Sequence, residues 1–305
     1  MKRFLLRRVL SLFPTMLVIV TIAFVLVRIA PGGPFDSERA IPPEVKADLE
    51  KKYGLDQSLP VQYLSFLKNA ARGDLGISMK YQGRTVNEII ADGFPATLAV
   101  GTFALIWALL IGISAGVIGA VRQNTAWDYG AMGFAMLGIS IPSFVLGPLL
   151  VLVFALTFFW FPPAGWGTWR HLVLPGVALG TVYAAYVARL TRGGLLEVVR
   201  QDFVRTARAK GLSERIVIWR HVLKGGLLPV VSFLGPMIAS LFTGSVVVEK
   251  IFATPGTGSY FVDSALNRDL TLTLGMVVFY SAFLLMANLA VDIAYGFLDP
   301  RVRHE

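Results

Sequence analysis

Six long apolar segments divide this chain, and each is about as long as a lipid bilayer is thick. They cover residues 9–30, 95–121, 129–160, 171–188, 229–248 and 271–298. A helix needs about 20 mostly apolar residues to cross a bilayer. Inside lipid every backbone N–H and C=O must be paired internally, which a helix achieves within one segment. The sequence therefore predicts an all-α, polytopic membrane protein with six transmembrane helices.

The composition supports this class and excludes others. Charged residues make up 15% of the chain and hydrophobic residues 55%, whereas a soluble domain carries about 25% charged residues. The absence of cysteine excludes disulfides, zinc–thiolate sites and cysteine nucleophiles. The net charge of +9 could suggest nucleic acid, but the basic residues gather at the edges of the apolar segments. Orientation in a membrane explains that placement, so we expect a lipid environment and no nucleic-acid partner.

The first apolar segment, 9–30, follows a short basic tail at 1–8. This arrangement also occurs in secretory signals. The run is long for a signal, and no small-x-small cleavage site closes it, so we expect a retained first span. Arg28 lies near its outer end, where a long cationic side chain can reach the interface. We therefore do not expect Arg28 to be a buried functional charge.

The longest polar region, 31–94, is expected to form an external cap of surface helices. Pro42, Pro43 and Glu44 indicate a helix start, Gly54 a stop, and 61–71 suits a second amphipathic helix. The region shows no catalytic cluster, which argues against an independent enzyme domain.

Glycine and proline mark the middle spans. Gly112 and Gly116 stand four residues apart, which is either a close-packing spacing or the ordinary glycine frequency of lipid helices. Pro142 should kink or break segment 129–160, since it removes a backbone donor. Lipid tolerates such a break where neighbours or water satisfy the freed carbonyl. Pro142 and Ser143 are therefore candidates for lining a translocation path, with a plain structural kink as the alternative.

A basic polar island at 189–228 orients the chain. It carries nine Lys/Arg against three Asp/Glu. If six spans alternate, this island falls on the same side as the basic tail 1–8 and the polar tail 299–305. Cytoplasmic loops carry excess Lys and Arg, so both termini are expected in the cytoplasm. The 31–94 region and the loops 161–170 and 249–270 then face outward.

Sites for chemistry are not visible in the sequence. It contains no nucleotide-binding G-x-x-x-x-G-K-[ST] motif, and three histidines lack metal spacing. We expect no catalytic residue, metal site or bound cofactor. Asp292 is the only carboxylate that the pattern places well inside a span, which is thin support for an ion-coupled carrier. The energy for any transport is expected from another protein.

The island has readable local structure. Residues 197–210 lack proline and glycine, and Phe203, Val204 and Ala207 offer an apolar face. Gly211 follows basic residues, which is typical of a helix end. Ser213 is a plausible N-cap with Glu214 in the next turn. The apolar side of this second helix, expected to run to about residue 224, consists of Ile216, Val217, Trp219, Val222 and Leu223.

Three interpretations fit two short helices joined by a tight turn: a solvated basic loop, a DNA-binding helix-turn-helix, or a docking hairpin for a cytoplasmic motor. The helix signals and repeated apolar residues argue against the loop, since they call for a protein partner. Tethering at both ends to a bilayer argues against DNA. We therefore favour the docking hairpin.

At these positions the chain resembles ATP-binding-cassette (ABC) importer permeases, whose E-A-A-x-x-x-G core forms a short coupling helix. Ala207 and Gly211 match that core, whereas Arg205 replaces its acidic first residue and Lys224 stands where proline is expected. The resemblance implies an ATPase-coupling role for Arg205, Thr206, Ala207, Arg208, Ala209, Lys210, Gly211, Leu212 and Ser213.

The peptide-importer branch fits across almost the whole length. Its motifs include R-T-A-R-A-K-G-L, R-I-A-P-G-G-P, K-Y-G-L-D, R-G-D-L-G-x-S and the closing D-P-R. The chain is most similar to the B-type permease subunits of bacterial oligopeptide importers, although dipeptide and nickel relatives share several motifs. The resemblance implies the type I importer permease fold with its core at 95–298, an extracytoplasmic helical cap and a cytoplasmic coupling loop.

The same resemblance implies a multi-pass protein of the bacterial inner membrane that translocates oligopeptides. Its partners would be a homologous second permease, two cytoplasmic ATPases that bind ATP and Mg, and an extracytoplasmic peptide-binding protein. The rival classes are an ion-coupled secondary carrier or channel and a non-transport scaffold or receptor subunit.

Overall fold

A computed structural model describes residues 2–30, 32–35, 42–244 and 246–298, without the side chains of 2–7, 292 and 294–298. The tail 299–305 and the Asp292 side chain therefore lie outside the described part. The regular elements of the described residues are all helices; these residues contain no strand, apart from one isolated bridge between Ile77 and Thr85. The expectation of an all-α protein is confirmed.

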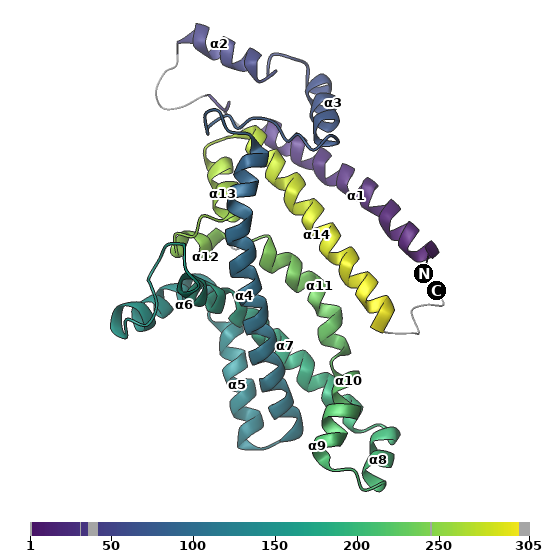
Figure 1. The fold of residues 1–305 in the computed structure, drawn as a ribbon. Helices are drawn as coiled ribbons and strands as arrows, with labels where there is room; N and C mark the ends of the chain where they lie inside the picture. The colour runs from purple at the N-terminus through teal and green to yellow at the C-terminus, as the bar shows by residue number, and fades with distance from the viewer. Residues whose placement is uncertain (1, 31, 36–41, 245, 299–305) are drawn as a thin grey trace. The chain divides into compact units, whose positions relative to one another are not determined.

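The long helices account for the apolar segments (Figure 1). Five stretches of the described chain are long and apolar enough to cross a membrane, and a bent helix pair could supply a sixth. The five are formed by α1 (Lys2–Ile29), α4 (Val86–Val121), α7 (Arg170–Val199), α11 (Leu228–Phe242) with α12 (Val246–Ile251), and α14 (Leu270–Leu298).

The chain divides into two compact units, which are described separately. The first comprises Thr97–Pro255 and the chain from Met286 onward, and the second Lys2–Ala96 with Gly256–Leu285. Helices α4 and α14 each contribute to both.

Glycines let α4 and α7 pack closely in the first unit. A Cβ on Gly112 would lie 2.7 Å from the carbonyl oxygen of Ala184, and one on Gly116 would lie 2.6 Å from that of Ala188. Such distances are too short for real Cβ atoms, so only glycine permits this backbone approach. Of the two interpretations of this glycine spacing, close packing is the one that the structure bears out.

The predicted third span is bent. Helix α5 (Ala126–Ser140) meets the helical run of α6 (Ser143–Leu150) and the π-helix η1 (Val151–Thr157) at an angle of 106°. Pro142 occupies the N-cap position of α6. The break predicted at Pro142 is confirmed, because a proline there cannot continue the hydrogen-bond ladder of α5.

The second unit contains the helices of the expected cap, α2 (Pro43–Lys52) and α3 (Leu59–Ala70), together with α13 (Thr257–Leu266). Gly54 takes a left-handed φ of +66°, in agreement with the predicted helix stop. The core of this unit includes Val86, Ile89, Leu272 and Met276, which join the start of α4 to the start of α14.

Several helices extend beyond the expected boundaries. Helix α4 begins at Val86 rather than at residue 95 and carries Pro95 inside, since a proline in the interior removes one hydrogen bond without always ending the helix. Helix α7 continues to Val199, eleven residues past the expected end at 188, because Arg, Leu and Glu are good helix formers outside lipid too. The expected loop 249–270 contains α13 and the end of α12.

Candidate functional site

The basic island forms a helical hairpin in the first unit (Figure 1). Helix α8 (Asp202–Ala209) is followed by a tight turn and then by one helical run made of α9 (Glu214–Ile216), the π-helix η2 (Val217–Val222) and α10 (Leu223–Gly226). The first helix is shorter than expected, because α7 occupies the chain up to Val199.

The turn at Gly211 has the predicted geometry. Gly211 takes a φ of +77°, which glycine adopts without steric cost. Its N–H donates to the Arg208 carbonyl at 2.9 Å. Ser213 stands at the N-cap position, but its side chain makes no capping bond. The turn is instead closed by Arg208, whose guanidinium donates to both carboxylate oxygens of Glu214, at 2.7 and 3.3 Å.

One face of the hairpin is buried against its own spans. Val204 and Ala207 of α8 pack with Val217 and Val222 of η2 and with Leu195 near the end of α7. The expectation that all these apolar residues call for a separate partner is therefore wrong. Their first role is to seat the hairpin on α7 and on the end of α4, because burial removes their apolar surface from water.

Backbone contact strengthens this seat. A Cβ on Gly226 would lie 3.0 Å from the Leu195 Cα, and one on Gly194 would lie 2.2 Å from the Gly226 carbonyl oxygen. The backbones of α7 and α10 therefore touch, with no side chain between them at these glycines.

The opposite face remains open. The side chains of Phe203, Ile216 and Trp219 are 47%, 45% and 69% exposed. Of the nine residues expected to couple to an ATPase, Ala207 is buried and the others are exposed. Exposed aromatic and arginine side chains on a firmly seated element are the composition of a protein-docking surface.

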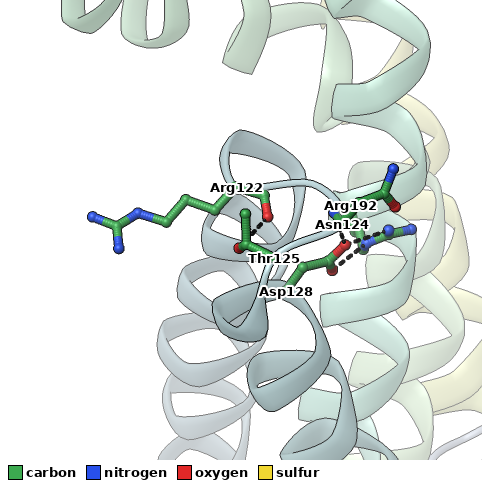
Figure 2. A network of polar contacts seen from close by, with 5 residues as sticks. All are labelled: Arg122, Asn124, Thr125, Asp128 and Arg192. Carbon is green, nitrogen blue, oxygen red and sulfur yellow. Dashed lines mark hydrogen bonds and ion pairs between the residues drawn. The ribbon is translucent and has the colours of Figure 1, made fainter.

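An ion pair fixes the turn between α4 and α5 to α7 beside this hairpin (Figure 2). Asp128 is 2% exposed. Its two oxygens accept hydrogen bonds from Nε and Nη2 of Arg192, both at 2.7 Å, and the Asn124 N–H donates to it at 3.0 Å. This bidentate geometry is the strong form of a charge-assisted pair. Arg192 lies in α7, so the pair links two successive spans.

Sequence reasoning missed this pair, because Asp128 lies between the apolar segments 95–121 and 129–160, where a short polar turn is expected. The available signal was a single carboxylate in the first turn of a helix, in a chain whose island 189–228 is rich in arginine. That signal does not identify the partner, which lies 64 residues away.

A second buried carboxylate belongs to Glu249, the first residue of the loop 249–270 that the sequence predicts to face outward. Glu249 lies in α12, is 2% exposed and accepts a hydrogen bond from the Thr97 hydroxyl at 2.8 Å. Glu249 is the third residue from the end of the candidate span Leu228–Ile251, so the interpretation of Asp292 as the only carboxylate well inside a span stays a prediction.

Pro142 and Ser143, the candidate path residues, lie at the bend between α5 and α6. A cavity of about 630 Å³ adjoins this bend, but neither residue lines it. The hydroxyl of Thr181 in its wall donates to the Val177 carbonyl and accepts from the Trp107 indole. The remaining wall is apolar, so this cavity is unsuited to a water-filled path.

Fold and site together define a helical membrane protein with a hairpin that is packed on its own spans by one face and exposed on the other. Comparison with known proteins agrees. Residues 108–304 match the family described as "Binding-protein-dependent transport system inner membrane component", and residues 1–101 match the N-terminal model of such membrane components.

Whole-length relatives are also found. The chain is 49% identical to the oligopeptide transport system permease protein OppB of Salmonella typhimurium, over 100% of both chains. It is 45% identical to the dipeptide transport system permease protein DppB of Bacillus subtilis, over 99% of this chain and 98% of the relative. Identity to the glutathione transport system permease protein GsiC of Escherichia coli O6:H1 is 37%, over 100% of both.

Two solved structures share the fold. An inward-facing form of the MetNI methionine ABC transporter has a TM-score of 0.56 at 18% identity, covering 69% of this chain and 96% of its own. An amino acid ABC transporter has a TM-score of 0.53 at 18% identity, covering 68% and 94%.

The chain belongs to the binding-protein-dependent transport family, as a membrane-integral permease subunit of an ABC importer that is not itself an enzyme. Such a permease works with ATPase subunits and a second permease.

Proposed function

We propose that this chain moves oligopeptides across the bacterial inner membrane. The proposal is supported by whole-length relatives named as oligopeptide permeases at 44–49% identity. The relative named for dipeptide transport falls within that range at 45%, and the relative named for glutathione transport is less similar at 37%. A dipeptide or nickel substrate is the alternative within the same branch.

The proposed assembly contains this chain, a homologous second permease, two cytoplasmic ATPases and an extracytoplasmic peptide-binding protein. ATP and Mg bind to the ATPases, because this chain has no nucleotide-binding loop. The excess of Lys and Arg in the tail 1–8 and the island 189–228 supports cytoplasmic N- and C-termini.

The observation that carries the proposed mechanism is the two-sided hairpin. Its buried face is seated on α7 and the end of α4, and its open face carries Phe203, Trp219 and the arginines. An ATPase bound to the open face pulls on α7 through the buried face when ATP closes the ATPase dimer. The spans then turn from inward-open to outward-open.

Such a switch has a definite energetic requirement. Moving a two-state equilibrium from 1:99 to 99:1 takes about 5.5 kcal/mol of differential binding. A loosely attached loop would dissipate that energy in its own motion, whereas the Gly194–Gly226 backbone contact leaves little room for it. Pro142 and Ser143 remain the proposed path residues, since the bend that they form interrupts a span.

Reconstitution in liposomes tests the function. The complete assembly should take up a labelled oligopeptide when ATP is present on the cytoplasmic side, and omission of any one partner should abolish uptake. Competition by unlabelled dipeptide, glutathione, nickel and longer peptides ranks the substrates. Uptake by this chain alone under a proton or sodium gradient would overturn the proposal in favour of a secondary carrier.

A further inference from the structure

A polar cavity of about 340 Å³ lies in the second unit at the end of α1. Its wall combines side chains from α1, α2, α3 and the start of α14. Among them are two cations, Arg28 and Lys52, and the neutral polar residues Gln57, Gln62 and Asn69.

Within the described residues, neither cation is paired with a carboxylate. The Nε atom of Arg28 is buried without a hydrogen-bond partner, and its guanidinium lies 5.3 Å from the centre of the Phe24 ring. The Lys52 ammonium lies 5.8 Å from the Tyr53 ring. Asp74 also lines the cavity, but one of its oxygens accepts the Gly76 N–H at 2.9 Å. Rings alone leave the Arg28 guanidinium without a hydrogen-bond acceptor, and no carboxylate of the described residues forms an ion pair with Arg28 or Lys52, so both cations can accept an anionic ligand.

The position of Arg28 along the membrane span indicates which anion is available to this cavity. Arg28 lies in the last turn of α1, a candidate span that is only 11% buried by the rest of the chain. The neighbouring side chains of Val25, Leu26 and Ile29 are 45%, 63% and 73% exposed. Such a surface faces hydrocarbon, so the end of α1 lies at the headgroup boundary, where lipid phosphates are the abundant anions.

We propose that this cavity is a binding site for a phospholipid headgroup. Arg28 and Lys52 hold the phosphate, the neutral polar side chains surround it, and the acyl chains lie along the exposed face of α1. This inference depends on the membrane span and not on the proposed peptide substrate. It revises the expectation for Arg28, which has a binding role instead of simply reaching toward the interface.

Native mass spectrometry of the assembled transporter tests the proposal, by titration with phosphatidylglycerol, phosphatidylethanolamine and diacylglycerol. Both phospholipids should bind, and diacylglycerol, which lacks phosphate, should not. Arg28→Gln should weaken phospholipid binding about tenfold, as expected for a lost hydrogen bond to a charged group. Lys52→Gln should weaken it about fivefold, as expected for one cation near a membrane surface.

Arg72→Gln is the matched control, because Arg72 is exposed, belongs to the same unit and does not line the cavity. It should leave phospholipid binding unchanged. If Arg28→Gln prevents assembly, Lys52→Gln on the exposed end of α2 decides the question. Equal loss in the Arg72 variant, no loss in the Arg28 and Lys52 variants, or displacement of the lipid by a transported peptide would overturn the proposal. Inorganic phosphate binding as tightly as phospholipid would reassign the site to a soluble anion.

Discussion

Two buried aspartates, Asp128 in the first unit and Asp269 in the second, hold turns next to helices by different chemistry. Asp128 is 2% exposed and faces the Arg192 guanidinium, with both hydrogen bonds at 2.7 Å. Asp269 is fully buried, and within the described residues its hydrogen bonds come from neutral donors. Its oxygens accept from the Ser78 hydroxyl and from the N–H groups of Met79 at 3.1 Å, Lys80 at 3.2 Å and Leu272 at 3.0 Å.

The difference predicts opposite responses to substitution. If Asp128 loses its charge, Arg192 is left without compensation, and its own removal should relieve the damage. If Asp269 loses an acceptor, backbone N–H groups are left unsatisfied, and no side-chain removal can relieve them. The ion pair therefore joins two spans through one side-chain contact, whereas the Asp269 network ties a loop to the start of α14 through several backbone N–H groups.

Tyr53 adds to the Asp269 network. Burial, together with the negative charge of Asp269, raises the pKa of Tyr53. Its hydroxyl donates to the Ser78 carbonyl at 3.2 Å. This contact extends the network to the end of α2.

The largest effect is expected from Asp128→Asn. It should destabilise the permease by about 3 kcal/mol, the low end for breaking a buried pair, because Arg192 is 28% exposed. Thermal unfolding of the assembled transporter measures the change. In a double-mutant cycle, Asp128→Asn with Arg192→Gln should be more stable than Asp128→Asn alone; simple additivity would refute the interpretation.

Asp269→Asn is expected to cost about 2 kcal/mol, because one acceptor oxygen becomes an NH₂ group that faces N–H donors. The same unfolding assay applies, with Ser78→Ala added as the second substitution. No recovery is expected in the double variant. If the double variant regained as much stability as the Asp128→Asn, Arg192→Gln variant does, the Asp128 and Asp269 contacts would not differ in kind.

Gly211→Ala is expected to cost about 1 kcal/mol, since an L-residue is strained at a left-handed φ. No atom lies within 4 Å of a Cβ placed there, so backbone strain is the whole effect. Gly211→Asn should cost less, because asparagine tolerates this conformation. Amide hydrogen exchange should show faster opening confined to the hairpin; equal exchange in the alanine and asparagine variants would contradict this account.

Trp219→Ala should change stability least, by within about 0.5 kcal/mol, as for an exposed side chain. Val217, two residues earlier, is fully buried, and Val217→Ala is the matched control with a clear loss of stability. Only Trp219→Ala should lower ATP-driven uptake without lowering the melting temperature. If Trp219→Ala unfolds the hairpin instead, its side chain is structural.

Local sequence patterns predicted much of this structure, but they could not predict contacts between residues far apart in the chain. The length of the apolar segments predicted the spans. Pro142 predicted the break between α5 and α6, and Gly211 predicted the hairpin turn, because proline and glycine act on the backbone within one or two helical turns. The Asp128–Arg192 and Ser78–Asp269 contacts join residues 64 and 191 positions apart. No spacing rule covers such distances, since the partner of a carboxylate is chosen by packing.

The apolar residues of the hairpin illustrate the same limit. Periodicity marked Val204 and Trp219 alike as apolar positions, yet the structure buries one against α7 and leaves the other 69% exposed. Hydrophobicity alone does not tell an internal contact from a docking surface. Only the arrangement of α7, α8 and η2 separates the two faces.

The most direct test of the coupling role is site-specific crosslinking, which the absence of cysteine makes simple. Single variants Phe203→Cys and Arg205→Cys place a thiol on the open face of the hairpin, and Arg72→Cys places one on the cap. In the assembled transporter, the two hairpin thiols should crosslink to an ATPase subunit, with yields that change when ATP is added. The cap thiol should not. Equal labelling at all three positions, or no ATPase crosslink from the hairpin, would contradict the account.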